Sequence, residues 1–335
     1  MIGYYVHHQG RGHLQRMRCI AAHLKTPLTV LSSLPAAGGD GPWIDLPMDD
    51  TSAVDPTANG TLHWVPLHDN GLRERMAKIA AWIGTAKPDL VVVDVSVEVA
   101  TLCRLMGVPT IVAAMRGDRF DPAHRAAYDA AYALLAPWAA EFAVPDWPTG
   151  WLDKAFHAGA ISRFADRVPQ PSKQDTGSRR GLVLWGSGGD GVPMDRVVAL
   201  AAATTGWEWR VAGRAPRGNG DLWELLQWAD VIVTHGGQGA VAEVATARRP
   251  AVVIAEQRPH GEQAATAAAL GAAGLAVTLP GWPAASQWPS LLARAGQLDV
   301  EQWVRWAPAD AARRAADFID AAATEVRRTT EQPVA

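Results

Sequence analysis

Short apolar segments alternate with longer amphipathic segments along most of the chain. The short segments are rich in Val, Ile and Leu, which is typical of strands that are buried on both faces. The longer segments repeat apolar residues at intervals of three and four, which predicts helices. In the first half we expect strands at residues 2–6, 28–31, 90–93 and 110–112 and helices at residues 14–24, 72–83 and 98–106.

The same alternation starts again after residue 180. Here we expect strands at residues 182–185, 209–212, 231–234 and 251–254 and helices at residues 194–203, 222–228, 240–247 and 263–270. Continuous apolar strands that alternate with helices predict parallel sheets covered by helices on both faces. The expected fold class is therefore α/β, with two Rossmann-like, doubly wound parallel-sheet domains that face a cleft.

A polar stretch with two Pro, two Ser and one Gly and without periodicity separates the two halves at residues 169–180 and is interpreted as a linker. We expect a first domain at 1–168, a second at 181–300, helices at 301–328 that pack back on the first domain, and a tail at 329–335. The length of 335 residues agrees with two domains.

Charge and apolar content exclude several classes of protein. The formal net charge of −3 gives no electrostatic reason to expect nucleic acid as a partner. No run of 18 apolar residues and no signal peptide is apparent, so a cytoplasmic location is expected, without a transmembrane segment. The helix at 72–83 carries Arg73, Arg75 and Lys78 beside an apolar stripe. A core-facing helix with a solvated basic side is the preferred interpretation, and peripheral membrane contact is the alternative.

Three glycine-rich loops follow predicted strands, at residues 10–13, 186–191 and 235–239. At such places the backbone can approach an anion at a helix N-terminus. We therefore expect Gly12, Ser187 and Gly188 to contact a phosphorylated ligand. The second loop also fits the dinucleotide pattern Gly-x-Gly-x-x-Gly, but Glu208, the acidic residue downstream, begins the next strand and is poorly placed for a ribose.

The third loop combines anion donors with a carboxylate on one helix. Thr234, His235 and the glycines after them precede a helix, and Glu243 lies eight residues after the histidine. Backbone amides bind phosphate and a carboxylate binds two vicinal hydroxyl groups, so this pattern favours a nucleoside diphosphate.

The stretch from Ala229 to Gly281 resembles the donor-binding half of UDP-glycosyltransferases of the GT-B fold, both the natural-product enzymes and the MurG-type family 28 enzymes. The resemblance rests on the His-Gly turn, on Glu243, and on an acidic residue followed by Gln after the next strand. It implies that the diphosphate binds His235, Gly236, Gly237, Gln238 and Gly239, the ribose binds Glu243, and the donor sugar binds Glu262 and Gln263. The base-stacking Trp of the plant enzymes has no equivalent at the right distance upstream.

The first half resembles the same families at the turn from Gly10 to His13 and at Asp94, which ends a predicted strand. The resemblance implies that His13 is the general base for an acceptor hydroxyl and that Asp94 orients it. At Asp94 the alternative is a cap for the following helix. Arg16 and Arg116, with Asp118, are expected either to line the acceptor cleft or to form surface ion pairs.

The predicted activity is transfer of a sugar from a nucleoside-diphosphate sugar, expected to be a UDP-sugar, to a small-molecule or lipid-linked acceptor. Inversion by direct displacement is expected, with no metal because no Asp-x-Asp pair occurs, and with no cofactor beyond the donor as co-substrate. The alternatives are a UDP-sugar hydrolase of the pseudaminic acid type, a nucleotide-sugar-binding protein without catalysis, and a dinucleotide-dependent oxidoreductase.

Tryptophan is unusually frequent, with 15 residues against four Tyr and five Phe. Those in predicted strands and helices are expected to pack in the core. Four in loop-like stretches are candidates for stacking on a sugar or an aromatic acceptor, namely Trp43, Trp64, Trp282 and Trp288.

Overall fold

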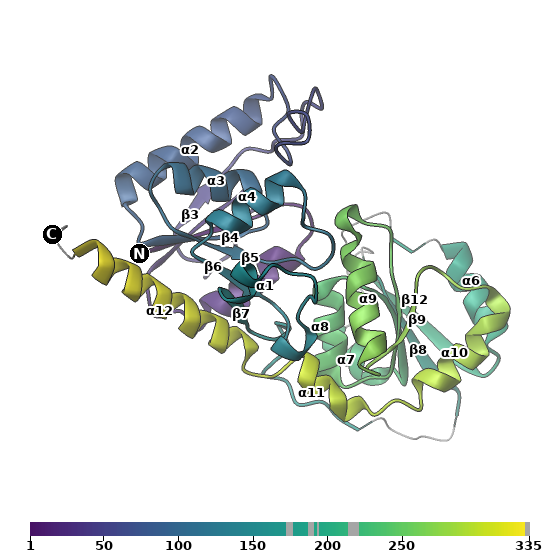
Figure 1. The fold of residues 1–335 in the computed structure, drawn as a ribbon. Helices are drawn as coiled ribbons and strands as arrows, with labels where there is room; N and C mark the ends of the chain where they lie inside the picture. Colours follow the sequence, from purple (N-terminus) through teal and green to yellow (C-terminus); the bar gives the residue numbers. More distant parts are fainter. Residues whose placement is uncertain (172–176, 187–190, 193, 214–220, 332–335) are drawn as a thin grey trace. The chain divides into compact units, whose positions relative to one another are not determined.

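The computed structural model describes residues 1–171, 177–186, 191–192, 194–213 and 221–331 (Figure 1). The chain divides into two compact units. Unit 1 comprises Met1–Met115, Arg119–Ala158 and Asp310–Ala335, and unit 2 comprises Arg116–Asp118 and Gly159–Ala309. Each unit contains a parallel sheet with helices, which confirms the predicted fold class.

Unit 1 has seven parallel strands in the order β3-β2-β1-β4-β5-β6-β7. The strands are β1 (Ile2–Val6), β2 (Leu28–Ser32), β3 (Trp43–Asp45), β4 (Leu90–Asp94), β5 (Thr110–Ala113), β6 (Ala133–Ala136) and β7 (Ala155–His157). The central strands β1 and β4 are buried at every residue, as their continuous apolar sequences predicted.

Several helices of unit 1 follow a residue whose side chain caps them. Its helices are α1 (Gly12–Ala21), α2 (Asn70–Ala86), α3 (Val97–Leu105), α4 (Pro122–Ala130), the short η1 (Ala140–Phe142) and α5 (Thr149–Leu152), and α12 (Ala311–Glu331). The side chains of Asp69, Ser96 and Asp121 accept hydrogen bonds from backbone N–H groups in the first turns of α2, α3 and α4. Because Ser96 caps α3, Asp94 is not needed for that purpose.

Helix α12 belongs to unit 1 although it is the last helix in the sequence. It lies beside α1 (Figure 1), and its Asp320 accepts hydrogen bonds from the backbone N–H groups of Lys25 and Thr26. Phe318 stacks on Phe156 of β7 with ring centroids 4.3 Å apart. The C-terminal segment thus supplies part of the core of unit 1.

Unit 2 has five parallel strands in the order β12-β11-β10-β8-β9. They are β8 (Arg179–Leu184), β9 (Trp207–Ala212), β10 (Val231–His235), β11 (Ala251–Ile254) and β12 (Val277–Leu279). The helices are α6 (Met194–Ala203), α7 (Leu222–Trp228), α8 (Gln238–Ala247), η2 (Pro259–Gly261), α9 (Glu262–Ala272), η3 (Ala285–Gln287), α10 (Trp288–Ala295), η4 (Val300–Gln302) and α11 (Trp303–Trp306).

The boundaries differ from the expected ones in three places. Strand β8 begins at Arg179, so the last two residues of the proposed linker belong to the sheet. The division between units falls at Ala158 and Gly159 instead of at residues 168 and 169. Helix α11 groups with unit 2, while α12 groups with unit 1.

Tryptophans form much of both cores. Trp138, Trp147 and Trp151 are buried in unit 1, with ring centroids 5.7 Å apart for the first two and 5.9 Å apart for the last two. Trp288 is fully buried in the core of unit 2, which makes its proposed role in stacking on a ligand wrong. Trp64 donates from its ring nitrogen to the carbonyl oxygen of Asp49, at 2.7 Å.

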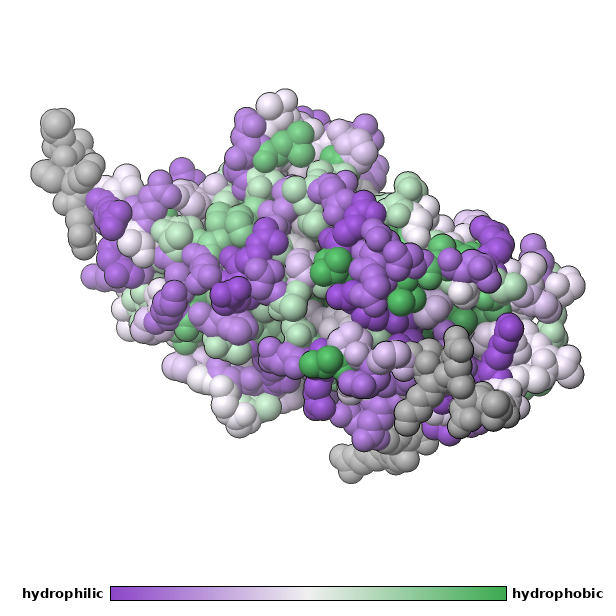
Figure 2. All heavy atoms as spheres, turned by 90° about the horizontal axis from the view of Figure 1, so that it is seen from below, coloured by the Kyte–Doolittle hydropathy of each residue, from purple (hydrophilic) through white to green (hydrophobic). Residues whose placement is uncertain are grey.

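The surface carries only scattered large apolar side chains, of which Leu105, Val168 and Val198 are among the most exposed. Figure 2 shows one face that is mostly hydrophilic, with hydrophobic residues in small separate groups. Within the described residues, no helix is both long enough and apolar enough to cross a membrane. Arg75 of α2 is 1% exposed, so the basic side expected for this helix is reduced to Arg73 and Lys78.

Candidate active site

Both sheets have a switch point, where the strand order reverses beside the first strand of the unit. In unit 1 this point lies between β1 and β4, whose last residues Val6 and Asp94 are paired. In unit 2 it lies between β8 and β10, where Leu184 pairs with Thr234. In open parallel sheets ligands bind beyond the carboxyl ends of the strands at such points.

His13 and Asp94 meet at the switch point of unit 1. The Nδ1 atom of His13 lies 2.8 Å from Oδ1 of Asp94, which is fully buried, while the His13 side chain is 18% exposed. Because the carboxylate accepts a hydrogen bond, Nδ1 carries the proton and Nε2 of a neutral His13 keeps its lone pair. The structure thus brings together the two residues that the resemblance paired.

Arg16 donates hydrogen bonds to both oxygens of the same carboxylate. Its Nε atom donates to Oδ2 of Asp94 at 2.9 Å, its Nη2 atom donates to Oδ1, and Nη2 lies 3.0 Å from Nδ1 of His13. Burial alone would raise the pKa of Asp94, but the charge of Arg16 and the contact with His13 outweigh it and hold that pKa well below its usual range. Arg16 is 7% exposed, so the alternative of a surface ion pair is wrong.

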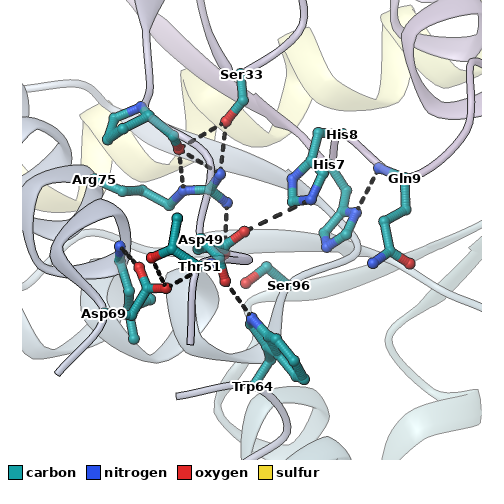
Figure 3. Close-up of polar contacts among 12 residues, drawn as sticks. His7, His8, Gln9, Ser33, Asp49, Thr51, Trp64, Asp69, Arg75 and Ser96 are labelled. Atoms are coloured by element: carbon teal, nitrogen blue, oxygen red, sulfur yellow. Dashed lines mark hydrogen bonds and ion pairs between the residues drawn. The ribbon is translucent and has the colours of Figure 1, made fainter. Parts of the chain in front are cut away.

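A second polar network lies next to the dyad in unit 1 (Figure 3). The ring of His7 stacks on His8 with centroids 4.6 Å apart, and Nε2 of His8 lies 3.6 Å from Asp49. Arg75 contacts the other oxygen of Asp49 at 2.9 Å and donates to the hydroxyl of Tyr5 at 2.9 Å. Sequence reasoning placed none of these residues in a site, because they come from segments far apart in the chain.

His235 lies between two glycines at the switch point of unit 2. The amide of Gly186 points to Nε2 of His235 and the amide of Gly237 points to Nδ1, both at 3.0 Å. A Cβ atom on either glycine would collide with the ring, which explains why glycine occupies both positions. Burial lowers the pKa of His235, and Arg258 adds to this effect while Glu256 opposes it, so the ring is neutral at pH 7.

Only one nitrogen of a neutral imidazole accepts a hydrogen bond. Therefore one of the two glycine amides faces a ring N–H in either tautomer and remains without a good acceptor. Helix α8 starts directly after Gly237, and amides in the first turn of a helix have no acceptor within it. This end of the sheet thus concentrates N–H donors, as the His-Gly turn predicted.

Gln263 is buried and connects two loops at the switch point of unit 2 through hydrogen bonds. Its Oε1 atom accepts hydrogen bonds from the amides of Gly236 at 3.0 Å and Glu256 at 3.1 Å, and its Nε2 atom lies 3.4 Å from Glu256. The carboxylate of Glu256 also accepts from the ring nitrogen of Trp185 at 3.0 Å. Sequence reasoning missed Glu256, although it follows β11 by two residues, at the edge where the other site residues lie.

Glu243 forms an ion pair in unit 2. Its Oε1 atom accepts a hydrogen bond from Nε of Arg163 at 2.8 Å, and its side chain is 15% exposed. Burial raises the pKa of Glu243, and the charge of Arg163 opposes this effect. Arg163 lies in a segment without strand or helix, and no pattern in the sequence indicated this contact.

The remaining expected site residues lie at the starts of helices or outside the described residues. Gly12 begins α1, and a Cβ there would meet no atom within 4 Å. Gln238 and Gly239 start α8, and Glu262 starts α9. Ser187 and Gly188 lie outside the described residues.

The two other charged residues proposed for the acceptor side, Arg116 and Asp118, lie in unit 2. Arg116 is 4% exposed, with its guanidinium 5.2 Å from the ring centre of Trp306, and burial lowers its pKa to about 10. The amide of Asp118 donates to the carbonyl oxygen of His260 at 2.8 Å. Arg116 is therefore buried beside an aromatic ring and does not lie at the surface.

Residues 221–281 match the model of the glycosyltransferase family 28 C-terminal domain. This stretch contains His235, Glu243 and Gln263, the residues that carried the resemblance in the sequence. No curated protein matches the chain in sequence.

Solved structures share the fold over nearly the whole chain. A glycotransferase of kitacinnamycin is 17% identical, with a TM-score of 0.70 over 96% of this chain and 98% of that one. The calicheamicin glycosyltransferase CalG4 is 17% identical, with a TM-score of 0.65 over 97% and 98%. MurG of Acinetobacter baumannii is 14% identical, with a TM-score of 0.63 over 96% and 99%. Residues 221–281 of unit 2 therefore match the family 28 C-terminal domain, and the chain shares the fold of these glycosyltransferases.

Proposed function

We propose that the protein transfers a sugar from a nucleoside-diphosphate sugar to an acceptor hydroxyl, with inversion and with His13 as general base. The observation that carries this proposal is the dyad of His13 and Asp94 at the switch point of unit 1. An acceptor hydroxyl is a poor nucleophile at neutral pH unless a base removes its proton as it attacks.

The dyad suits that task for three reasons. The hydrogen bond to Asp94 fixes the tautomer, so that Nε2 presents a lone pair. The carboxylate stays ionised and can stabilise an imidazolium ion as it forms. The His13 side chain is partly exposed, so an acceptor can reach the ring.

We assign departure of the nucleoside diphosphate to unit 2. The glycine amide left without an acceptor at His235 and the N-terminal end of α8 supply donors for the diphosphate. The proposed mechanism uses no metal ion, because the sequence has no Asp-x-Asp pair that would bind one. Gln263 accepts a hydrogen bond from the amide of Gly236 and so fixes the loop that carries these donors. We assign Gln263 this positioning role in place of direct contact with the donor sugar.

Glu243 is the proposed partner of the ribose hydroxyls. Arg163 occupies one of its carboxylate oxygens, so a bound nucleotide either displaces Arg163 or uses the other oxygen. The base of the donor is open between uracil and thymine. A similar structure, that of the Streptomyces glycosyltransferase SsfS6, is a complex with thymidine diphosphate; its chain is 17% identical, with a TM-score of 0.54 over 99% of each chain.

Three alternatives make different predictions. A hydrolase releases diphosphate from the donor without an acceptor, and a binding protein without catalysis releases none under any condition. A dinucleotide-dependent oxidoreductase needs an acidic residue for the ribose, but Glu208 lies within β9 and pairs with Arg210 at 3.0 Å. This placement of Glu208 argues against the oxidoreductase.

The test begins with thermal stabilisation by UDP, dTDP, GDP and NAD, since a ligand that binds only the folded state raises the melting temperature. We expect UDP or dTDP to stabilise the protein and NAD to have no effect. Stabilisation by NAD alone would overturn the proposal. Release of diphosphate from the matching sugar nucleotide is then measured with and without a panel of acceptors.

The catalytic role of His13 is tested by His13→Ala, with the exposed His23→Ala as matched control on the segment after α1. We expect His13→Ala to lower kcat by about 10²–10⁴-fold with nucleotide binding retained. His23→Ala should behave as the wild type. Full product formation by His13→Ala would exclude the proposed mechanism.

A further inference from the structure

We propose that His7 is an acceptor-binding residue whose Nε2–H group donates a hydrogen bond to an oxygen next to the reacting hydroxyl. The acceptor would then be a vicinal diol, as in a sugar or another polyhydroxylated compound. This inference rests on the proposed role of His13, beside which His7 lies in unit 1.

The loop after β1 fixes the tautomer of His7. The backbone N–H of Gln9 donates to Nδ1 of His7 at 3.1 Å (Figure 3). Nδ1 therefore carries a lone pair, and in a neutral ring the proton must be on Nε2.

The environment keeps this ring neutral. Burial, together with the neighbouring His13, His8 and Arg75, lowers the pKa of His7 to about 3, and only Asp94 acts in the opposite direction. Above that pH His7 is neither a base nor a cation, and Nε2 is a permanent donor. His7 and His13 thus have opposite hydrogen-bonding character at Nε2.

The donor is available to a ligand. Among the described residues none accepts a hydrogen bond from Nε2 of His7, and the ring is only partly buried. His8 differs, because its unpartnered Nδ1 is buried. The stack on His8 and the contact of His8 with Asp49 hold the plane of the His7 ring, so the donor is preorganised.

The distance to His13 determines which oxygen His7 can serve. The two ring centroids are 6.2 Å apart and the rings are inclined by 66°. A donor to the nucleophilic oxygen itself would occupy a lone pair that the attack requires. The useful target is therefore a second oxygen on the neighbouring carbon, which a simple alcohol lacks.

The first test observes the imidazole of His7 directly. Long-range ¹H–¹⁵N NMR of the full chain between pH 4 and pH 8 should show a neutral ring protonated on Nε2 throughout. Addition of cis-1,2-cyclohexanediol should shift the Nε2 resonance, whereas cyclohexanol should not. A ring that titrates near pH 6.5, or that is protonated on Nδ1, would overturn the proposal.

The second test compares His7→Gln, whose amide restores a donor near the Nε2 position, with His7→Phe, which keeps a stacking ring but no donor. Donor turnover is measured with the diol and with the mono-alcohol. We expect the wild type and His7→Gln to prefer the diol by about tenfold in kcat/KM, as one hydrogen bond allows. His7→Phe should lose this preference with unchanged stabilisation by the nucleoside diphosphate.

Two outcomes contradict the role of His7. One is a wild type without preference for the diol, and the other is a His7→Phe variant that retains the preference. The proposed function fails on different measurements, namely nucleotide binding and the effect of His13→Ala, so the two failures are distinguishable.

Discussion

At the scale of single residues, the proposed active site in unit 1 depends on one buried carboxylate with several hydrogen-bond partners. Asp94 contacts His13 and Arg16, and the hydroxyl of Tyr4 lies 3.4 Å from Oδ2. The charge of Arg16 keeps Asp94 ionised inside the protein, and the hydrogen bond to Asp94 fixes the tautomer of His13. Removing the negative charge therefore affects stability and catalysis together.

Asp94→Asn is expected to lower kcat/KM by about 10²–10⁴-fold, because the amide no longer fixes the tautomer of His13 or stabilises its protonated form. It also breaks the buried ion pair with Arg16, which costs about 3–5 kcal/mol in the free energy of unfolding. Steady-state kinetics and urea unfolding measure the two effects. The matched control Tyr4→Phe removes only the long contact, and an equal loss in both variants would contradict the assignment.

His7 makes the stability of the protein depend on pH. Its pKa is about 3 in the folded state against an ordinary value near 6.5, so between these values the unfolded chain binds more protons. The contribution of His7 is therefore fully present above pH 6.5 and declines as the pH falls towards 3.

We expect the wild type to lose about 3 kcal/mol more than His7→Gln in the free energy of unfolding when the pH falls from 6.5 to 4. Denaturant unfolding at a series of pH values measures this difference. Parallel pH profiles of the two proteins would show that His7 is accessible to protons in the folded state. His8, whose pKa burial also lowers, remains in both proteins.

At the scale of elements, the second site is built from loops that follow β8, β10 and β11. Gln263 on α9 joins two of these loops through a single carbonyl oxygen. Because the residue is 3% exposed, no water replaces its hydrogen bonds.

Gln263→Leu is expected to destabilise the protein by about 2–4 kcal/mol, since the amides of Gly236 and Glu256 lose their acceptor. It should also weaken nucleoside diphosphate binding, because the loop that carries His235 is no longer held. Calorimetric titration and thermal unfolding measure both effects. Gln263→Glu keeps an oxygen that accepts both hydrogen bonds, although it places a second carboxylate beside Glu256. It should therefore retain more stability than Gln263→Leu if these two hydrogen bonds hold the loops.

At the scale of the whole molecule, the end of the chain completes the fold of its beginning. Helix α12 packs on α1 and β7 of unit 1, and its Ile319 is fully buried. Residues 1–158 therefore do not bury their core without a segment that follows unit 2 in the sequence.

Ile319→Ala should destabilise unit 1 by about 2–5 kcal/mol through the cavity it leaves. In hydrogen exchange, faster exchange is expected in α1 and β7, with unchanged exchange in β10 and α8 of unit 2. Leu105→Ala, at a position that is 80% exposed, serves as the control and should change neither. Equal acceleration in both units would show that they unfold as one.

The apolar pattern determined most of the fold. It placed α7 at Leu222–Trp228 and β11 at Ala251–Ile254 with the observed bounds, because these elements are buried and their periodicity is strong. The pattern missed β3, β6, β7 and β12. Strands β3 and β7 are three residues long and only partly buried, so no run of apolar residues marks them, whereas β6 is fully buried but only four residues long. Helix α12, which follows the second domain in the sequence, was expected to pack on the first domain, and it lies in unit 1.

Local motifs also determined the positions of His13, Asp94 and His235, since each lies where a strand ends at a glycine turn or helix start. Only the tertiary structure decided what surrounds them. Arg16 on α1 contacts Asp94 on β4, Arg163 contacts Glu243, and Gln263 accepts a hydrogen bond from the backbone of Gly236. Strand ends are encoded by neighbouring residues, whereas these partners are 78, 80 and 27 positions apart and meet only when the sheets form.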